Sequence, residues 1–237
     1  MDSYRLGRHI SHQFDNELEN IRNRVLVMGG MVEELLQMAI VPLLEGNESP
    51  EKLVRRDEKI NQLEIEIDEC CSQILARRQP TARDLRLVIA VGKAISDLER
   101  IGDEAKMIAR KTDDSKVKES RPYYNQLKVL VERVQGMLNQ ALDAFARMDA
   151  ESAVEVARQD KNIDDSYGEL LRSLINDMED SPKKVRRSVE LMWITRSLER
   201  IGDHAANICE HVVYVVKGKD VRHLSLDEME DEVNRPW

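Results

Sequence analysis

The chain has 237 residues, of which 34% are charged and 4% aromatic, and it contains only 10 glycines and 6 prolines. This composition favours long helices with charged outer faces over a sheet protein with many turns, and the net charge of −9 argues against a general nucleic-acid binder. The N-terminal segment has no apolar signal-peptide core, and no uncharged apolar stretch approaches the length that spans a bilayer, so we expect neither secretion nor a membrane span.

The first half of the chain is typical of three long helices, which we expect at residues 14–45, 50–78 and 82–111. Each segment carries apolar residues at the helical spacing of three and four. The stripes are Val25, Met28, Val32, Leu35, Ala39 and Leu43; Ile60, Leu63, Ile67 and Ile74; and Leu87, Val91, Ala94, Leu98, Ile101, Ala105 and Ile108. Residues 112–121 are polar and without apolar periodicity, which predicts a linker.

After Pro122 the pattern begins again. The cleanest heptad stripe of the chain is formed by Leu127, Val131, Val134, Leu138, Ala141, Phe145 and Met148. A short link at Asp149 then leads to a helix that carries Ile163, Leu170 and Leu174, and Ser181-Pro182 starts a last helix that runs to about Val216. The acidic tail from Lys217 is expected to be loose.

The two halves are copies of one another. Residues 98–105 read LERIGDEA and residues 198–205 read LERIGDHA, so that seven of the eight positions are identical. Asp57 and Ile60 likewise correspond to Asp160 and Ile163. We therefore predict an all-α fold, a tandem duplication of two antiparallel three-helix bundles with six long helices. The predicted units are residues 1–115 and 116–217, followed by the acidic tail 218–237.

Each copy of the phrase places a glutamate and an aspartate four residues apart. Glu99 with Asp103, and Glu199 with Asp203, therefore lie one turn apart on one face of a helix. The preceding helix of each half supplies a second acidic row, and we expect the two rows to face one another. The rows are Asp57, Asn61, Glu64 and Asp68 in the first half and Asp160 and Asp164 in the second.

Oxygen ligands of this kind suit hard cations such as Mg²⁺, Mn²⁺ or ferric iron, so Glu99, Asp103, Glu199 and Asp203 are the predicted metal ligands. A single pair of this spacing is usually a solvated face, and its repetition in both halves is what favours a metal. Gly102 and Gly202 offer the alternative that the phrase is kept for close helix packing. On the helix, His204 and His211 point away from the acidic stripe, which predicts surface or inter-helix histidines.

Other classes of site are poorly supported by the sequence. It contains no phosphate-binding or nucleophile-elbow glycine motif and no Glu-x-x-His pair of the di-iron bundles, so we predict that the chain is not an enzyme. A metal-dependent hydrolase or a metal-storage bundle that uses the same carboxylates is the alternative. A plain helical scaffold whose acidic stripes hold no ion is a third hypothesis.

The doubled LERIGD(E/H)A phrase, on the third helix of each of two three-helix units, resembles the PhoU family over nearly the whole chain. The resemblance implies a cytoplasmic, often homodimeric protein that binds divalent or ferric metal through the acidic pairs just named. It also implies a negative regulator of the phosphate-starvation response. Such a protein links a phosphate-specific ABC transporter to a sensor histidine kinase and is recruited through these partners to the inner face of the membrane.

Overall fold

The computed structural model describes residues 3–45, 50–112 and 121–235, and these residues are almost entirely helical and contain no strand. The predicted all-α class is therefore confirmed, and the predicted linker lies largely outside the described residues. The helices are α1 (Ser3–Leu44), α2 (Pro50–Arg78), α3 (Ala82–Lys111), α5 (Tyr124–Arg147), α6 (Ala150–Ala157), α7 (Asp160–Asp180), α8 (Val185–Lys217) and α9 (Leu226–Asn234), with 3₁₀ turns η1 (Arg121–Tyr123) and η2 (Pro182–Lys184).

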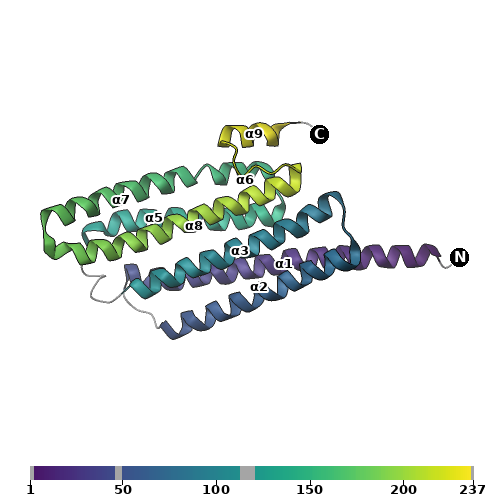
Figure 1. Ribbon diagram of the computed structural model, residues 1–237, viewed down its shortest axis with the longest axis horizontal. Helices are drawn as coiled ribbons and strands as arrows, with labels where there is room; N and C mark the ends of the chain where they lie inside the picture. The colour runs from purple at the N-terminus through teal and green to yellow at the C-terminus, as the bar shows by residue number, and fades with distance from the viewer. Residues whose placement is uncertain (1–2, 46–49, 113–120, 236–237) are drawn as a thin grey trace.

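The long helices form two antiparallel three-helix units that lie side by side (Figure 1). The first unit contains α1, α2 and α3, and the second contains α5, α8 and the consecutive pair α6 and α7. The units meet mainly where α3 packs on α8, and α1 also packs on α5. Helices α2 and α7 lie at opposite outer edges of the molecule. In the first unit α2 packs on α3, and in the second α7 packs on α8. These two helix pairs therefore lie on opposite sides of the molecule.

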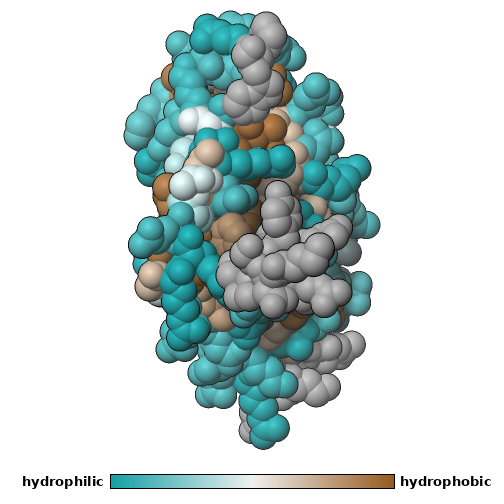
Figure 2. All heavy atoms as spheres, turned by 90° about the vertical axis from the view of Figure 1, so that its right-hand side faces the viewer, coloured by the Kyte–Doolittle hydropathy of each residue, from teal (hydrophilic) through white to brown (hydrophobic). Residues whose placement is uncertain are grey.

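The predicted apolar stripes form the core because each repeats with the period of a helix and so lies on one side of it. In α5, the heptad positions from Leu127 to Phe145 are buried, while Met148 ends the helix in the left-handed conformation. Charged side chains occupy the outer faces. Figure 2 shows the end of the bundle from which α1 projects, where hydrophilic side chains cover most of the described surface and apolar atoms show between them.

Two features of the helices differ from the sequence prediction. Helix α1 begins at Ser3 instead of residue 14. The helix expected after Asp149 is divided into α6 and α7 by a turn at Arg158 and Gln159, where Gln159 N–H donates to the Val156 carbonyl at 2.9 Å. This i→i−3 bond replaces the helical i→i−4 bond, which interrupts the helix without a glycine or a proline.

The prediction of a loose C-terminal tail is wrong for the described part of that segment. Residues 226–234 form α9, which starts with a capping box between Ser225 and Glu228. Met229 and Val233 are buried, and α9 packs on α6. Lys219 also forms an ion pair with Glu232. The tail is therefore a small covering element.

One helix bears on the expectation that no segment spans a bilayer. Among the described residues, one helical stretch, His12–Leu44, is long and apolar enough to cross a membrane by length and composition. The core helices of soluble proteins have the same length and composition, and the stripe of α1 from Val25 to Leu43 is buried against its neighbouring helices. The apolar character of this helix is thus used in the core.

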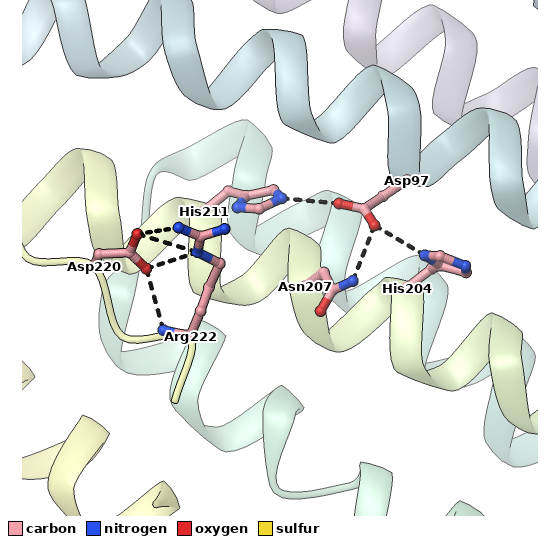
Figure 3. A network of polar contacts seen from close by, with 6 residues as sticks. All are labelled: Asp97, His204, Asn207, His211, Asp220 and Arg222. Carbon is pink, nitrogen blue, oxygen red and sulfur yellow. Dashed lines mark hydrogen bonds and ion pairs between the residues drawn. The ribbon is translucent and has the colours of Figure 1, made fainter. Parts of the chain in front are cut away.

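A polar network joins the two units at the contact between α3 and α8 (Figure 3). The partly buried carboxylate of Asp97 on α3 lies 2.9 Å from Nδ1 of His204 and 2.8 Å from Nε2 of His211, and it accepts a bond from Asn207 Nδ2 at 3.0 Å. Burial opposes ionisation here, but the bonds from His204, His211 and Asn207 lower the pKa of Asp97 to about 2. Both histidines are inter-helix residues, as predicted.

Two further bonds cross the same contact. Glu104 on α3 forms an ion pair with Arg200 on α8 at 2.8 Å. Near the other end of α8, Arg86 Nε donates to the Val215 carbonyl at 3.4 Å, which supplies a partner for one of the last carbonyls of that helix. The contact between the units is therefore polar at several places along its length as well as apolar.

Candidate metal centres

In the second unit the structure brings together the acidic residues of α7 and α8. Glu199 is only 7% exposed, and Asp203 lies one turn after it. Asp160 of α7 lies against the backbone of α8, since a Cβ added at Gly202 would be 3.3 Å from its Oδ1 atom. Asp164 lies one turn beyond Asp160 at the exposed rim. The two acidic rows therefore face one another, as predicted.

Two buried oxygen atoms of this cluster have no hydrogen-bond partner. They are Oδ1 of Asp160 and Oε2 of Glu199, which come from different helices. A buried carboxylate oxygen without a donor is energetically costly. No described cationic side chain lies within ion-pair distance of Asp160 or Asp203. The cluster therefore has unused acceptor capacity on both helices.

The electrostatics agree with this geometry. Burial, followed by the charge of Asp203, raises the pKa of Glu199 to about 7. Burial and the charges of Asp164 and Asp203 raise the pKa of Asp160 to about 6. The pKa of Asp203 is also raised, by burial and by Asp164, although Arg196 opposes the shift. Each carboxylate thus makes ionisation of its neighbours harder, which is the condition that a bound cation would relieve.

Arg196 is the cation nearest to Glu199, and it approaches from the rim. Its guanidinium pairs with Oε1 of Glu199, and its side chain is 48% exposed. The same guanidinium lies over the ring of Tyr167, 5.8 Å from the centroid. One oxygen of Glu199 is thus partnered at the edge of the cluster, while the other faces inward without a partner.

The cluster of the first unit has the same acidic pair and one added feature. Glu99 lies near Glu64 of α2 and Asp103, and burial followed by the charge of Asp103 raises the pKa of Glu99. Here, however, the ammonium of Lys106 lies 2.9 Å from Oδ2 of Asp57 and 2.8 Å from Oδ1 of Asp103. A lysine therefore joins one carboxylate of α2 to one of α3.

Three charged residues near the acidic motif were not predicted from the sequence: Lys106 and Arg196, which pair with its carboxylates, and Asp97, which pairs with His204 and His211. Lys106 follows Asp103 by three residues, a spacing at which a lysine can pair with an aspartate on the same helix. Asp97 directly precedes Leu98 at the start of the first copy of the phrase, and Arg196 precedes Glu199 by three residues. The i+3 spacing of Lys106 and Arg196 is a signal that the sequence contained. The contact of Lys106 with Asp57 depends on how α2 and α3 pack.

The donor set can be compared with what a metal requires. Among the described residues, no three histidine, cysteine, aspartate or glutamate side chains converge closely enough, as they stand, to hold a metal ion. The second cluster supplies carboxylate oxygens, two of them buried and unpartnered. Carboxylate end groups rotate easily about their terminal torsions, and oxygen donors fit a hard cation. The chemistry of the donors in the second unit therefore suits a hard cation, although the side chains as they stand do not form a closed set of ligands.

Comparisons with known proteins bear on the same residues. The family model of the PhoU domain matches residues 25–112 and 127–212, once in each unit. The phosphate-specific transport system accessory protein PhoU homolog of Pseudomonas aeruginosa is 47% identical over 96% of this chain and 95% of its own. The phosphate-specific transport system accessory protein PhoU of Escherichia coli is 42% identical over 97% of this chain and 96% of its own.

Two solved structures have the same fold. The crystal structure of PhoU from Pseudomonas aeruginosa matches with a TM-score of 0.82 and 44% identity, covering 87% of this chain and 100% of that chain. The phosphate transport system regulatory protein PhoU from Streptococcus pneumoniae matches with a TM-score of 0.79 and 32% identity, covering 88% of this chain and 99% of that chain. With its two copies of the domain, its duplicated acidic phrase and these full-length relatives, the chain belongs to the PhoU family.

Proposed function

We propose that the protein is a cytoplasmic, metal-binding adaptor that negatively regulates phosphate uptake and the phosphate-starvation response. It links a phosphate-specific ABC transporter to a sensor histidine kinase and reaches the inner face of the membrane through them. The role in phosphate transport is supported by relatives that are named accessory and regulatory proteins of phosphate transport and align over almost the full chain. A non-catalytic role is consistent with the same names.

The metal part of the proposal rests on the second unit. The observation that supports it most is that Asp160 and Glu199, on two facing helices, each have a buried oxygen without a hydrogen-bond partner. Asp203 lies beside them. A bound Mg²⁺, Mn²⁺ or iron ion would neutralise carboxylates whose mutual repulsion and burial disfavour ionisation. Glu99 and Asp103 are the corresponding candidate ligands of the first unit.

Metal binding is tested with purified protein. Protein stripped with a chelator and dialysed against Mn²⁺ should retain the metal by elemental analysis, and E199Q together with D203N should abolish retention by the second unit. E169Q is the matched control, because Glu169 is an exposed carboxylate on the neighbouring helix α7. Steady hydrolysis of a phosphate ester that is lost in E199Q would replace the adaptor with a metal-dependent hydrolase.

The regulatory part is tested in the cell. Deleting the gene should activate a phosphate-starvation reporter in phosphate-rich medium, and the wild-type gene or E169Q should restore repression. If the metal is required for signalling, E199Q with D203N should fail to restore it. Unchanged reporter output after deletion would remove the regulatory proposal.

The partner part is tested by cell fractionation. The protein should sediment with membranes when the transporter or the kinase is present and remain in the soluble fraction when both are deleted. Cross-linking in cells should give products that contain these partners. Light scattering of the purified protein at several concentrations tests the proposed homodimer.

A further inference from the structure

Lys106 provides the first acidic cluster with a cation of its own. Its side chain is 19% exposed, and its ammonium contacts Asp57 on α2 and Asp103 on α3 at 2.9 and 2.8 Å. Asp57 is itself 7% exposed, and it also accepts a 3.5 Å bond from Asn61. The ammonium thus lies between the two helices, where it bridges a carboxylate from each.

The second unit has the same pair of carboxylates without that cation. Asp160 corresponds to Asp57 and Asp203 to Asp103, while the position of Lys106 is taken by Ala206. The methyl group of alanine brings no charge, and Oδ1 of Asp160 is left buried without a partner. The cation nearest to this cluster, Arg196, pairs with Glu199 at the rim and does not bridge the helices.

The two units therefore differ in whether a side chain of the protein neutralises their buried carboxylates. In the first unit, the ammonium of Lys106 contacts a carboxylate of each helix, so Asp57 and Asp103 share one cation. In the second unit, Oδ1 of Asp160 is buried without a hydrogen-bond partner, and Arg196 pairs with Glu199 only. The carboxylates of the first cluster are thus neutralised by a side chain of the protein, whereas those of the second cluster lack such a bridging cation.

We infer that Lys106 takes the place of a metal ion in the first unit, so that the chain binds metal at the second unit and not at the first. This inference rests on the proposed metal-binding function and restricts it to the second unit, so that Glu99 and Asp103 do not bind metal in the wild-type protein. An ammonium has three donors and can satisfy carboxylates from two helices at once. A metal ion entering beside it would have to displace it and would be repelled by its charge. The two copies of one acidic motif would then hold their helices together with different cations.

Exchanging the two residues tests the inference directly. The probe is Mn²⁺, with retained metal measured by elemental analysis after dialysis of chelator-stripped protein. K106A should retain about twice as much Mn²⁺ as the wild type, A206K should retain almost none, and the double exchange should return to the wild-type amount. In the double exchange, retention should depend on Glu99 and no longer on Glu199, so E99Q should abolish it and E199Q should not.

The outcomes separate this inference from the proposed function. A wild type that retains no Mn²⁺ contradicts the proposed metal binding itself. A wild type that retains Mn²⁺ in amounts reduced by half in E99Q, or a K106A variant that gains none, overturns the assignment of Lys106 and leaves metal binding intact. K106M removes the charge while keeping most of the side-chain volume, and it should behave as K106A does if the charge is what matters.

A readout without metal tests the same geometry. In the presence of a chelator, K106M should lower the melting temperature, because Asp57 and Asp103 lose their shared cation. A206K should raise it, because the new ammonium can reach Asp160 and Asp203. Equal melting temperatures for K106M and the wild type, or a lower one for A206K, would contradict the bridging role.

Discussion

At the scale of single residues, the second cluster stands out because its carboxylates are poorly compensated by the protein. Glu199 and Asp160 keep buried oxygens without donors, and both have raised pKa values. Such an arrangement reduces the stability of the metal-free protein at neutral pH. It is a common property of sites that are built for a ligand instead of for stability.

The raised pKa values predict how the stability of the metal-free protein depends on pH. The pKa of Glu199 is about 7 in the folded protein against a reference value of 4.5, so between these values the native state holds a proton that the unfolded state has released. Stability therefore falls as the pH rises through this window. We expect a melting temperature roughly 5 °C lower at pH 7.5 than at pH 5 in a chelator.

E199Q should remove a large part of this slope, because the amide does not titrate, and E169Q should keep it. Thermal melts at a series of pH values measure the effect. A slope that E199Q leaves unchanged would show that Glu199 ionises normally in the folded protein. The bonds of Asp97 do not interfere, since its pKa is lowered to about 2 and its contribution is lost only in stronger acid.

The two glycines of the repeated phrase predict a second difference between the copies. A Cβ at Gly202 would lie 3.0 Å from Cδ1 and 3.2 Å from Cγ2 of Ile163, whereas the nearest atom at Gly102 is Cδ2 of Leu35 at 3.6 Å. We expect G202A to destabilise the protein by about 1 kcal/mol or more through overpacking. G102A should be neutral or stabilising by up to about 1 kcal/mol, because alanine favours helix.

Chemical denaturation of both variants measures the difference. Destabilisation of equal size in the two variants would mean that the close approach of α7 to Gly202 is not maintained in solution. Circular dichroism of both proteins provides the control that each remains helical.

The four candidate ligands could be named from the sequence because an i,i+4 spacing places two side chains on one helix face whatever the fold, and their role as ligands stays a prediction. The cationic side chains that pair with these carboxylates could not be predicted in the same way. Whether Lys106 pairs with Asp103 alone or also with Asp57 depends on how α2 packs on α3. The distance between these two helices cannot be read from the sequence. The same holds for Asp97, whose partners lie more than a hundred residues away.

At the scale of helices, α3 and α8 form the contact that unites the two units. They are the third helices of their units, each carries one copy of the acidic phrase, and Asp97 is the polar centre of their contact. Hydrogen bonds to a buried carboxylate are stronger than those between neutral groups. Because Asp97 contacts three polar side chains of α8, its loss leaves the buried His211 and the partly buried His204 and Asn207 without this partner.

D97A should therefore destabilise the protein by about 2 kcal/mol, within the range for unsatisfied buried polar groups. The matched control is D143A, because Asp143 is also ion-paired, with Arg147, but is largely exposed. We expect D143A to change stability by less than about 0.5 kcal/mol. Urea denaturation distinguishes the two, and equal effects would show that the network at Asp97 contributes little.

Most helices were predictable because long apolar stripes at helical spacing were present in α1, α2, α3, α5, α7 and α8. The break between α6 and α7 was not, since Arg158 and Gln159 are ordinary helix residues and no glycine or proline marks the turn. Helix α9 is short and mostly acidic, so it has no long stripe. Its one local signal was the spacing of Ser225 and Glu228, which is that of a capping box.

At the scale of the whole molecule, the two units share one continuous core. Helices α3 and α8 bury apolar side chains toward their own unit and toward the other, and Leu142 of α5 packs closely on Gly29 of α1. Separating the units would expose this surface. The duplication therefore gives two recognisable copies in sequence without giving two independent folding units.

We accordingly expect the chelator-treated protein to unfold in a single thermal transition whose calorimetric and van't Hoff enthalpies agree. Residues 1–115 alone should be less helical than the same residues within the full chain, because α3 would lose its contact with α8. Scanning calorimetry and circular dichroism measure these quantities. Two resolved transitions would indicate that the units fold separately.

The position of Asp97 between His204 and His211 restricts how the halves can move. The histidines are seven residues, or about two turns, apart on α8, and each contacts a different oxygen of the same carboxylate. A piston-like slide of α8 by one turn, about 5.4 Å in either direction, would carry one histidine out of reach. The two contacts together therefore hold α8 in one axial register against α3.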